Sequence, residues 1–256
     1  MALAASLLVV VLAVPPVLDP GLSGAERRAA VAAAAPEELA RAMREASPEE
    51  LVATSLAIVE RLGTYRVRMV KRERIGGRLR PAQEIDLFVR ETPFAVRLHY
   101  VAGPARGRVV VYDPSVREEE LRVHDGGLLS LLGSIWIGTG SRWARLDSNR
   151  SIRDAGLGNL LRRFLHDLEI AAPLGGFRVE HRGFDREGRY CLLWVAPAGG
   201  AGLESARTLV CADLAAGIPG RVEAYDASGA LLESYLFSEL ESQPLPDAFF
   251  DPAALP

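Results

Sequence analysis

Histidine, cysteine and serine side chains are the groups that most often carry catalysis or bind metals in proteins. The sequence contains four histidines, and they are dispersed at His99, His124, His166 and His181. None of them has the HExxH spacing of a zinc site, and no Gly-x-Ser-x-Gly motif marks a serine nucleophile. We therefore expect no catalytic residue, no metal and no cofactor. A hydrolase whose residues are dispersed along the chain is the weakest of three functional hypotheses.

The two cysteines have the spacing of a structural disulfide. Cys191 and Cys211 lie in two short, apolar, β-prone segments with a glycine-rich stretch between them. If these segments pair as a hairpin centred on Ala201, Val195 faces Arg207 and Cys191 faces Cys211. Directly opposed β-carbons lie about 4.5–5.5 Å apart, so we predict a Cys191–Cys211 disulfide that stabilises the fold by roughly 3 kcal/mol. Two buried free thiols are the alternative interpretation.

The remaining candidate site is apolar. A cavity between a helix and a sheet could be lined by Trp136, Trp143, Leu161, Phe164, Leu165 and Trp194. Large aromatic side chains more often fill a solid core, which is the alternative. A cavity of this kind needs no catalytic group, because each buried CH₂ of an acyl chain contributes about 0.8 kcal/mol to binding.

Composition limits the class of protein. The chain has 256 residues, is 49% hydrophobic and 25% charged, and carries a formal net charge of −3. These values exclude a disordered polymer, a collagen and a multi-pass membrane protein. Of the 30 basic residues only Lys71 is a lysine, and 33 acidic residues balance them. We therefore expect no nucleic-acid partner.

The N-terminus predicts export. An apolar run from Ala2 to Val14 is too short for a typical membrane-spanning helix, which needs about 20 residues, but it suits the core of a signal peptide. Small residues at Ser23, Gly24 and Ala25 precede the charged Glu26. We predict a signal peptide over residues 1–25, cleaved near Ala25, and a periplasmic or secreted product that is at most peripheral to a membrane. A leader retained as an anchor is the alternative.

Two amphipathic helices are expected beyond the leader. Residues 26–46 form an Ala-rich linker or first helix, and residues 47–256 form a single domain. Ser47 can cap a helix whose capping box is completed by Glu50, and Gly63 ends that helix. A second helix carries an apolar stripe from Leu157 to Leu168.

The other segments alternate with a period of two, which is typical of strands covered on one face. In the first predicted hairpin Arg72 pairs with Glu84, so Met69 faces Leu87. The stretch from Leu128 to Trp143 is too mixed to assign. Further strands are predicted over residues 94–100, 108–112, 121–123, 177–182, 190–196, 207–212, 221–225 and 231–238. Together these elements predict an α+β protein: a large curved antiparallel sheet, or half-barrel, with helices packed on its concave face.

Two sets of motif residues resemble known bacterial families. The first set is Tyr65, Lys71, Glu73, Gly77, Leu79, Gln83, Ile85, Arg90, Pro93, Val96, Gly107, Arg108 and Tyr112. It resembles an uncharacterised exported family, the domain of unknown function numbered fifteen seventy-one. The closing set is Cys211, Asp213, Pro219, Tyr225, Asp226, Gly229, Tyr235, Phe237, Leu245, Asp247 and Phe250. The order and spacing of these residues are similar to those of lipoprotein-carrier (LolA-like) domains and of RseB-type envelope regulators. The resemblance covers roughly residues 50–252 and transfers no catalytic residue.

What the resemblance implies is a LolA-like half-barrel whose apolar cavity receives acyl chains or a lipidated partner. Our first hypothesis is accordingly a non-catalytic exported binding protein that holds a lipid, an acyl chain or a lipidated segment. The second is an envelope sensor or scaffold with a solid core, which binds a protein partner through its Arg-rich sheet face or a strand edge.

Overall fold

The structure is a computed structural model that describes residue 15 and residues 18–127, 131, 133–197 and 202–255. The apolar run Ala2–Val14 of the predicted leader lies outside the described residues. In the described part of the chain, no helix combines the length and apolar character that a bilayer crossing requires.

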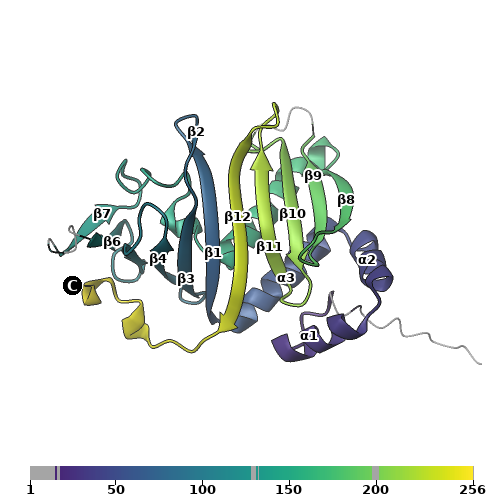
Figure 1. Cartoon of the computed structure of the whole chain (residues 1–256), viewed down its shortest axis with the longest axis horizontal. Helices are drawn as coiled ribbons and strands as arrows, with labels where there is room; N and C mark the ends of the chain where they lie inside the picture. Colours follow the sequence, from purple (N-terminus) through teal and green to yellow (C-terminus); the bar gives the residue numbers. More distant parts are fainter. Residues whose placement is uncertain (1–14, 16–17, 128–130, 132, 198–201, 256) are drawn as a thin grey trace, which may run out of the picture.

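Two strand meanders in the described residues form one antiparallel sheet, in the order β7-β6-β5-β4-β3-β1-β12-β11-β10-β9-β8 (Figure 1). The first meander comprises β1 (Thr64–Ile75), β2 (Arg78–Leu79), β3 (Gln83–Arg90), β4 (Ala95–Ala102), β5 (Val109–Tyr112), β6 (Glu120–His124) and β7 (Ser134–Gly138). The second comprises β8 (Arg178–Phe184), β9 (Tyr190–Val195), β10 (Arg207–Asp213), β11 (Ile218–Tyr225) and β12 (Leu231–Ser242). The predicted fold class is confirmed, and β7 fills part of the stretch that the sequence pattern left unassigned.

The centre of the sheet joins the first strand of the fold to the last. β1 pairs with β12 over almost its whole length, from Tyr65 opposite Ser242 to Glu73 opposite Glu233. Each meander therefore has one long strand in the middle of the sheet and shorter strands toward an edge, and β7 and β8 are the two edges.

The register predicted for the first hairpin is wrong by two residues. Met69 lies opposite Ile85 rather than Leu87, and Lys71 lies opposite Gln83. The turn is at Gly76–Gly77, both at positive φ, and the returning strand is interrupted after Leu79, where Pro81 has no N–H to donate to the ladder. Because a shift of two residues keeps every side chain on its predicted face, the inward alternation is unchanged.

Four α-helices precede or interrupt the sheet in the described residues: α1 (Gly24–Ala33), α2 (Pro36–Glu45), α3 (Pro48–Leu62) and α4 (Leu157–Ala171). The predicted capping box of α3 is present, because the Ser47 hydroxyl accepts from the Glu50 N–H and the Glu50 carboxylate accepts from the Ser47 N–H. Figure 1 shows α3 crossing one face of the sheet behind β10–β12. We call this helix-covered face the inner face.

A buried contact fixes the start of α4. The Tyr65 hydroxyl donates to the Glu91 carboxylate at 2.9 Å and accepts the Leu157 N–H at 2.8 Å. A β-carbon at Gly158 would come within 2.2 Å of the Glu91 carboxylate, so only glycine fits beside this group. Burial, reinforced by the negative charge of Glu91, raises the pKa of Tyr65, which keeps its hydroxyl protonated and able to donate.

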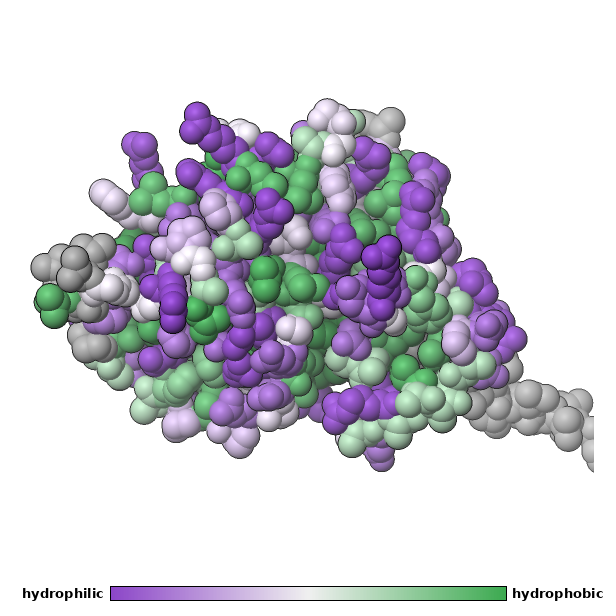
Figure 2. Space-filling model, in the orientation of Figure 1, coloured by the Kyte–Doolittle hydropathy of each residue, from purple (hydrophilic) through white to green (hydrophobic). Residues whose placement is uncertain are grey.

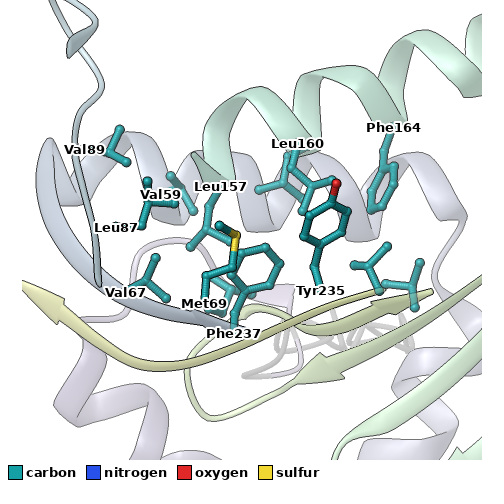
Figure 3. Packing of buried hydrophobic residues seen from close by; sticks show 14 of the residues in the cluster. Val59, Val67, Met69, Leu87, Val89, Leu157, Leu160, Phe164, Tyr235 and Phe237 are labelled. Atoms are coloured by element: carbon teal, nitrogen blue, oxygen red, sulfur yellow. The ribbon is translucent and has the colours of Figure 1, made fainter. Parts of the chain in front are cut away.

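The core lies between α3, α4 and the inner face. Figure 3 shows Leu157, Leu160 and Phe164 projecting from α4 toward side chains of the sheet, among them Met69 and Phe237. The predicted apolar stripe of α4 is confirmed: Leu157, Leu160, Leu161, Phe164 and Leu168 are all buried.

The outer face of the sheet mixes hydrophilic and hydrophobic residues (Figure 2). Several of its arginines form ion pairs across neighbouring strands. Arg66 and Arg68 both contact one oxygen of Asp86, at 2.6 Å and 2.7 Å. Burial alone would raise the pKa of Asp86, but hydrogen bonds from these two arginines lower it overall.

The predicted disulfide is confirmed. Cys191 lies opposite Cys211 in the β9–β10 ladder, with Val195 opposite Arg207, and the two cysteines form a disulfide. The C-terminal tail docks through its phenylalanines, since Phe250 is fully buried and Arg97 lies 4.8 Å from the centre of the Phe249 ring.

Candidate binding pocket

A hollow walled mainly by apolar side chains lies on the inner face of β3–β7. Its volume is about 350 Å³, and it lies between these strands and the segment of residues 143–156 that leads into α4. We call it the main pocket. Its size is within the range of small-molecule binding sites.

One cross-strand row forms the floor of the main pocket. Leu87 lies opposite Leu98, Leu98 opposite Val110, Val110 opposite Val123, and Val123 opposite Ile135. The row therefore crosses five neighbouring strands with an apolar residue at every position. Because successive residues of a strand point to opposite faces, the apolar residues of this row all lie on the inner face.

The far end of the main pocket is polar. Lys71 and Glu73 are buried on the inner face of β1, and the Lys71 ammonium donates to the Asp147 carbonyl at 3.0 Å and lies 3.6 Å from the Glu73 carboxylate. The Tyr235 hydroxyl donates to Glu73 at 2.8 Å. Burial lowers the pKa of Lys71, and the nearby Glu73 carboxylate offsets part of this effect.

These buried charges hold the covering segment in place. The Glu73 carboxylate accepts the Ser148 hydroxyl at 3.1 Å and the Asn149 N–H at 2.7 Å. Next along the chain, Arg150 binds the buried Glu233 carboxylate of β12 at 2.9 Å and 2.5 Å. The segment over the pocket is thus anchored to two central strands, and further along it Arg153 binds Glu119 at 2.6 Å.

Basic and acidic groups at the polar end are matched. Arg108 contacts Asp125 at 2.5 Å and Asp147 at 2.8 Å. Its pKa is raised, because these two carboxylates outweigh the effect of burial, which alone would lower it. The polar end therefore offers hydrogen-bonding groups without a marked excess of either charge.

The wall of the main pocket also includes exposed apolar side chains. In the described residues Ile135 is 56% exposed, Trp143 74% and Leu146 44%, and all three line the pocket. The nearby Leu131 is 84% exposed. Four of the exposed large hydrophobic side chains in the described structure thus lie between residues 131 and 146. Such a concentration of exposed apolar side chains is typical of an interaction site.

The structure distributes the six sequence-predicted site residues over three places. Only Trp143 lines the main pocket. Trp136 lies one residue out of phase with the inward-facing Ile135 and Ile137, and its ring is beneath the guanidinium groups of Arg117 and Arg122, at 4.2 Å and 5.1 Å. The expectation that Trp136 faces the same hollow as Trp143 therefore does not match its position.

The other four predicted residues belong to the packed region under the second half of α4. Leu161, Phe164 and Trp194 are buried, and Leu165 is half-buried against the same core. The Trp194 ring lies 5.6 Å from Phe164 and 5.7 Å from Phe177. We call these three rings the aromatic cluster.

A second cavity, of about 230 Å³, borders the aromatic cluster. Phe164 and Trp194 line it, but Arg150, Arg163 and Glu233 form much of the remaining wall. The indole N–H of Trp194 is buried and has no hydrogen-bond partner within the described residues. This cavity is more polar than the apolar cavity expected around these rings from the sequence.

Sequence reasoning missed Lys71 and Glu73 as pocket residues, although a signal was present. Both have the same parity along β1 as the inward-facing Tyr65, Val67 and Met69. Two charged residues at apolar positions of an alternating strand indicate a polar site on the buried face, because isolated buried charges are costly.

The histidines do not form a catalytic arrangement. Among the side-chain contacts of the described residues, His181 lies 3.3 Å from the Tyr190 hydroxyl, and His166 lies 3.7 Å from Glu169. Neither contact joins a histidine to a serine. The one group with metal-ligand spacing in the described structure is Asp185 with Cys191 and Cys211, whose sulfurs are bonded to each other and offer no thiolate.

Comparison with known proteins places the chain in a family. A family model described as protein of unknown function (DUF1571) matches residues 62–255, a range that contains every described strand of the sheet and the whole main pocket. The chain belongs to this family. The match begins at the end of α3 and runs to the docked C-terminal tail. No curated protein matches the sequence.

Several solved structures are similar in fold. The Mycobacterium tuberculosis lipoprotein LppX has 16% identity, the match covers 78% of this chain and 97% of that one, and the TM-score is 0.44. A LolA superfamily protein from Nitrosomonas europaea has 12% identity, coverage of 80% and 98%, and a TM-score of 0.37. MucB, in the Pseudomonas aeruginosa MucA/MucB complex, has 19% identity, coverage of 79% and 60%, and a TM-score of 0.42.

Proposed function

We propose that the protein is an exported, non-catalytic binding protein that holds an acyl chain, of a lipid or of a lipidated partner, in the main pocket. The observation that carries this proposal is the unbroken apolar row from Leu87 to Ile135 on the floor of a cavity of about 350 Å³. An acyl chain gains about 0.8 kcal/mol per buried CH₂, so such a floor binds it without any catalytic group.

The wall of the pocket supports the same occupant. The polar end offers hydrogen-bonding groups of Lys71, Tyr100 and Ser151, and the exposed Trp143 and Leu146 form another part of the wall. An amphiphile with one polar and one apolar part matches this arrangement. Acyl chains differ in length, and a pocket that opens to solvent accommodates that variation.

Ligand binding is tested directly on the purified full chain. Organic extraction followed by mass spectrometry is expected to release lipid from the native protein, and a fluorescent long-chain fatty acid is expected to bind and be displaced by unlabelled fatty acid. A protein that releases no lipid and binds no fatty acid would refute the proposal.

A pocket-filling variant makes the test specific. Val110 is at the centre of the apolar row, so Val110→Trp places an indole inside the main pocket and is expected to weaken fatty-acid binding at least tenfold. Leu174→Trp is the matched control, because Leu174 is 44% exposed and lies outside the pocket. Circular dichroism and thermal unfolding establish that both variants fold, and Leu98→Phe is a milder second filling variant. Unchanged binding in folded Val110→Trp protein would place the ligand elsewhere.

Export is the second part of the proposal. The Cys191–Cys211 disulfide is typical of an oxidising compartment outside the cytosol. We propose the predicted leader of residues 1–25 and a mature chain of residues 26–256. Cell fractionation checks the compartment, and N-terminal sequencing of the mature protein checks the boundary.

Contacts around α1 make that sequencing informative. Ser23 caps α1, and the buried Arg27 donates to the Asp19 carbonyl. Cleavage near Ala25 removes these partners from the mature chain, whereas cleavage before Leu18 keeps them. A mature protein that begins with Glu26 supports the proposed boundary, and one that begins before Leu18 moves it upstream.

The alternative role, a sensor or scaffold for a protein partner, is distinguished by the same variants. The outer arginines that we considered for it, such as Arg66 and Arg68, are already paired with carboxylates. A stoichiometric protein partner that is captured equally by the wild type and by Val110→Trp would favour this alternative.

A further inference from the structure

Beside the opening of the main pocket, one short segment combines exposed apolar and exposed basic residues. Trp143 and Leu146 are 74% and 44% exposed, and Arg142 and Arg145, adjacent to them in sequence, are exposed as well. Ile135 at the edge strand β7 is 56% exposed and lines the same opening. We call these five residues the mouth patch.

The two arginines of the mouth patch are not neutralised by the protein. Within the described residues, neither guanidinium has a carboxylate partner. The acidic side chains around the pocket opening already have other partners: Arg108 binds both Asp125 and Asp147.

Glu119 and Glu120 are paired in the same way. Arg153 binds Glu119 at 2.6 Å, and Arg117 binds Glu120 at 2.5 Å. The arginines of the mouth patch therefore present positive charge to an external partner, on either side of an exposed tryptophan.

We propose that the mouth patch docks the protein on an anionic lipid bilayer, with the opening of the main pocket facing the bilayer. Tryptophan favours the boundary between lipid headgroups and acyl chains. Leucine and isoleucine beside it gain free energy from entering the acyl region, and arginine keeps its charge among the phosphates while its methylene stem remains in the apolar layer.

This combination distinguishes a bilayer from a protein partner. An apolar patch alone fits either a bilayer or a protein. Arginines without a carboxylate partner on both sides of a tryptophan match a bilayer, because its headgroup layer is uniformly anionic and its interior is apolar. The patch contains no carboxylate of its own that an anionic surface would repel. The docking geometry also lets an acyl chain pass between bilayer and pocket without crossing water.

The inference deepens the proposed function and rests on it in one respect: the bilayer serves as the source or the acceptor of the ligand only if the main pocket binds acyl chains. Docking itself is measured without any ligand. The two claims can therefore fail separately.

The experiment uses the full chain and phospholipid vesicles made with and without phosphatidylglycerol. Co-sedimentation is expected with the anionic vesicles, to weaken as salt is added, and to be much weaker with phosphatidylcholine alone. Tryptophan emission is expected to shift to the blue on binding, because Trp143 leaves water, and the shift is expected to disappear in Trp143→Phe.

A charge variant with a matched control identifies the surface. In Arg142→Gln/Arg145→Gln, partitioning to anionic vesicles is expected to fall about thirtyfold, since each arginine near such a surface contributes about 1 kcal/mol and 1.4 kcal/mol is tenfold. Arg41→Gln/Arg44→Gln on α2 removes the same charge from exposed positions at the other end of the molecule and is expected to change partitioning less than about threefold.

An apolar pair of variants completes the design. Leu146 and Leu174 are both 44% exposed, but only Leu146 is in the mouth patch. Leu146→Ser is therefore expected to weaken vesicle binding severalfold, and Leu174→Ser to leave it unchanged.

The outcomes separate the two claims. Equal losses in the Arg142/Arg145 and Arg41/Arg44 variants, or no preference for anionic vesicles, overturn docking through the mouth patch. Arg142 and Arg145 do not line the pocket, so their variant is expected to bind fatty acid normally. Vesicle binding by a protein that binds no fatty acid would retain the docking surface and refute the proposed function.

Discussion

The two ends of the inner face carry the same alternating pattern but are filled differently. Where α4 itself covers the sheet, Leu161, Phe164 and Trp194 are buried, and the hollows that border them are smaller, about 230 Å³ and about 50 Å³. Over most of β3–β7 the covering element is the segment of residues 143–156, whose only described helical part is the 3-10 turn Ile152–Asp154, and a cavity of about 350 Å³ remains.

The difference lies in the covering element rather than in the strands. A helix presents a row of long side chains at regular spacing and fills the space above a sheet. The covering segment is irregular, is held by Glu73 and Glu233, and directs Trp143 and Leu146 partly into water. Strand alternation decides which face is apolar, and the covering element decides whether that face is a core or a pocket.

The largest effect expected from this comparison is on stability. Leu161→Ala removes a side chain packed on all sides, and we expect it to lower the free energy of unfolding by about 4–5 kcal/mol. Leu98→Ala removes a side chain that already borders a cavity, so we expect a loss of about 2–3 kcal/mol. Urea unfolding measures both values. Equal losses would show that the main pocket is filled as tightly as the core.

A somewhat smaller effect is expected from the disulfide, which lies on the other face of the β9–β10 ladder. Replacing both cysteines by alanine, Cys191→Ala/Cys211→Ala, is expected to destabilise the protein by roughly 3 kcal/mol. Because the disulfide belongs to the strands away from the main pocket, fatty-acid affinity is expected to stay the same. Reduced fatty-acid affinity at a temperature where the variant is fully folded would indicate that the two ends of the sheet are coupled.

The two tryptophans near β7 provide a sharper test of which face binds. Trp143→Ala is expected to weaken fatty-acid binding by about five- to tenfold, or about 1 kcal/mol, because Trp143 lines the pocket. Trp136→Ala is expected to leave binding unchanged, because that ring lies under Arg117 and Arg122. Fluorescence titration measures both affinities. The reverse order would place the ligand on the outer face.

The smallest effect is the pH dependence that the buried Lys71 contributes. Burial lowers the pKa of Lys71 in the folded state. At pH values between the pKa of Lys71 in the folded protein and its pKa in the unfolded chain, the unfolded chain therefore binds more protons than the folded protein. The free energy of unfolding then gains a contribution that rises with pH in this window. We expect unfolding measurements from about pH 7 to about pH 10 to show a more positive slope in the wild type than in Lys71→Met. Identical slopes would mean that Lys71 keeps an ordinary pKa, as an exposed lysine would.

Much of the fold was predictable because its signals are local. The capping box of Ser47 and Glu50, the stripe of α4 and the alternation of most strands each depend on residues within a few positions of one another. The Cys191–Cys211 pairing was predictable for the same reason, since one short hairpin sets its register. The register of β1 with β3 was not, because Pro81 interrupts the returning strand in a way that counting from a turn does not capture.

The candidate site was predicted less well than the fold. Four of the six candidate residues chosen for their size and apolarity fell in the packed region under α4, and two of these, Phe164 and Trp194, belong to the aromatic cluster. The residues that form the pocket floor, such as Leu98 and Val110, are ordinary strand residues. Nothing in their type separates them from core residues elsewhere in the sheet.

The sequence by itself determined which elements form and which face of each is apolar, because helix and strand periodicities are set by neighbouring residues. Only the tertiary structure decided that β1 pairs with β12, bringing Lys71 opposite Tyr235, and that residues 143–156 rather than an α-helix cover most of β3–β7. Both depend on contacts between segments distant in the chain. The volume left between two packed layers is a property of their fit and not of either layer alone.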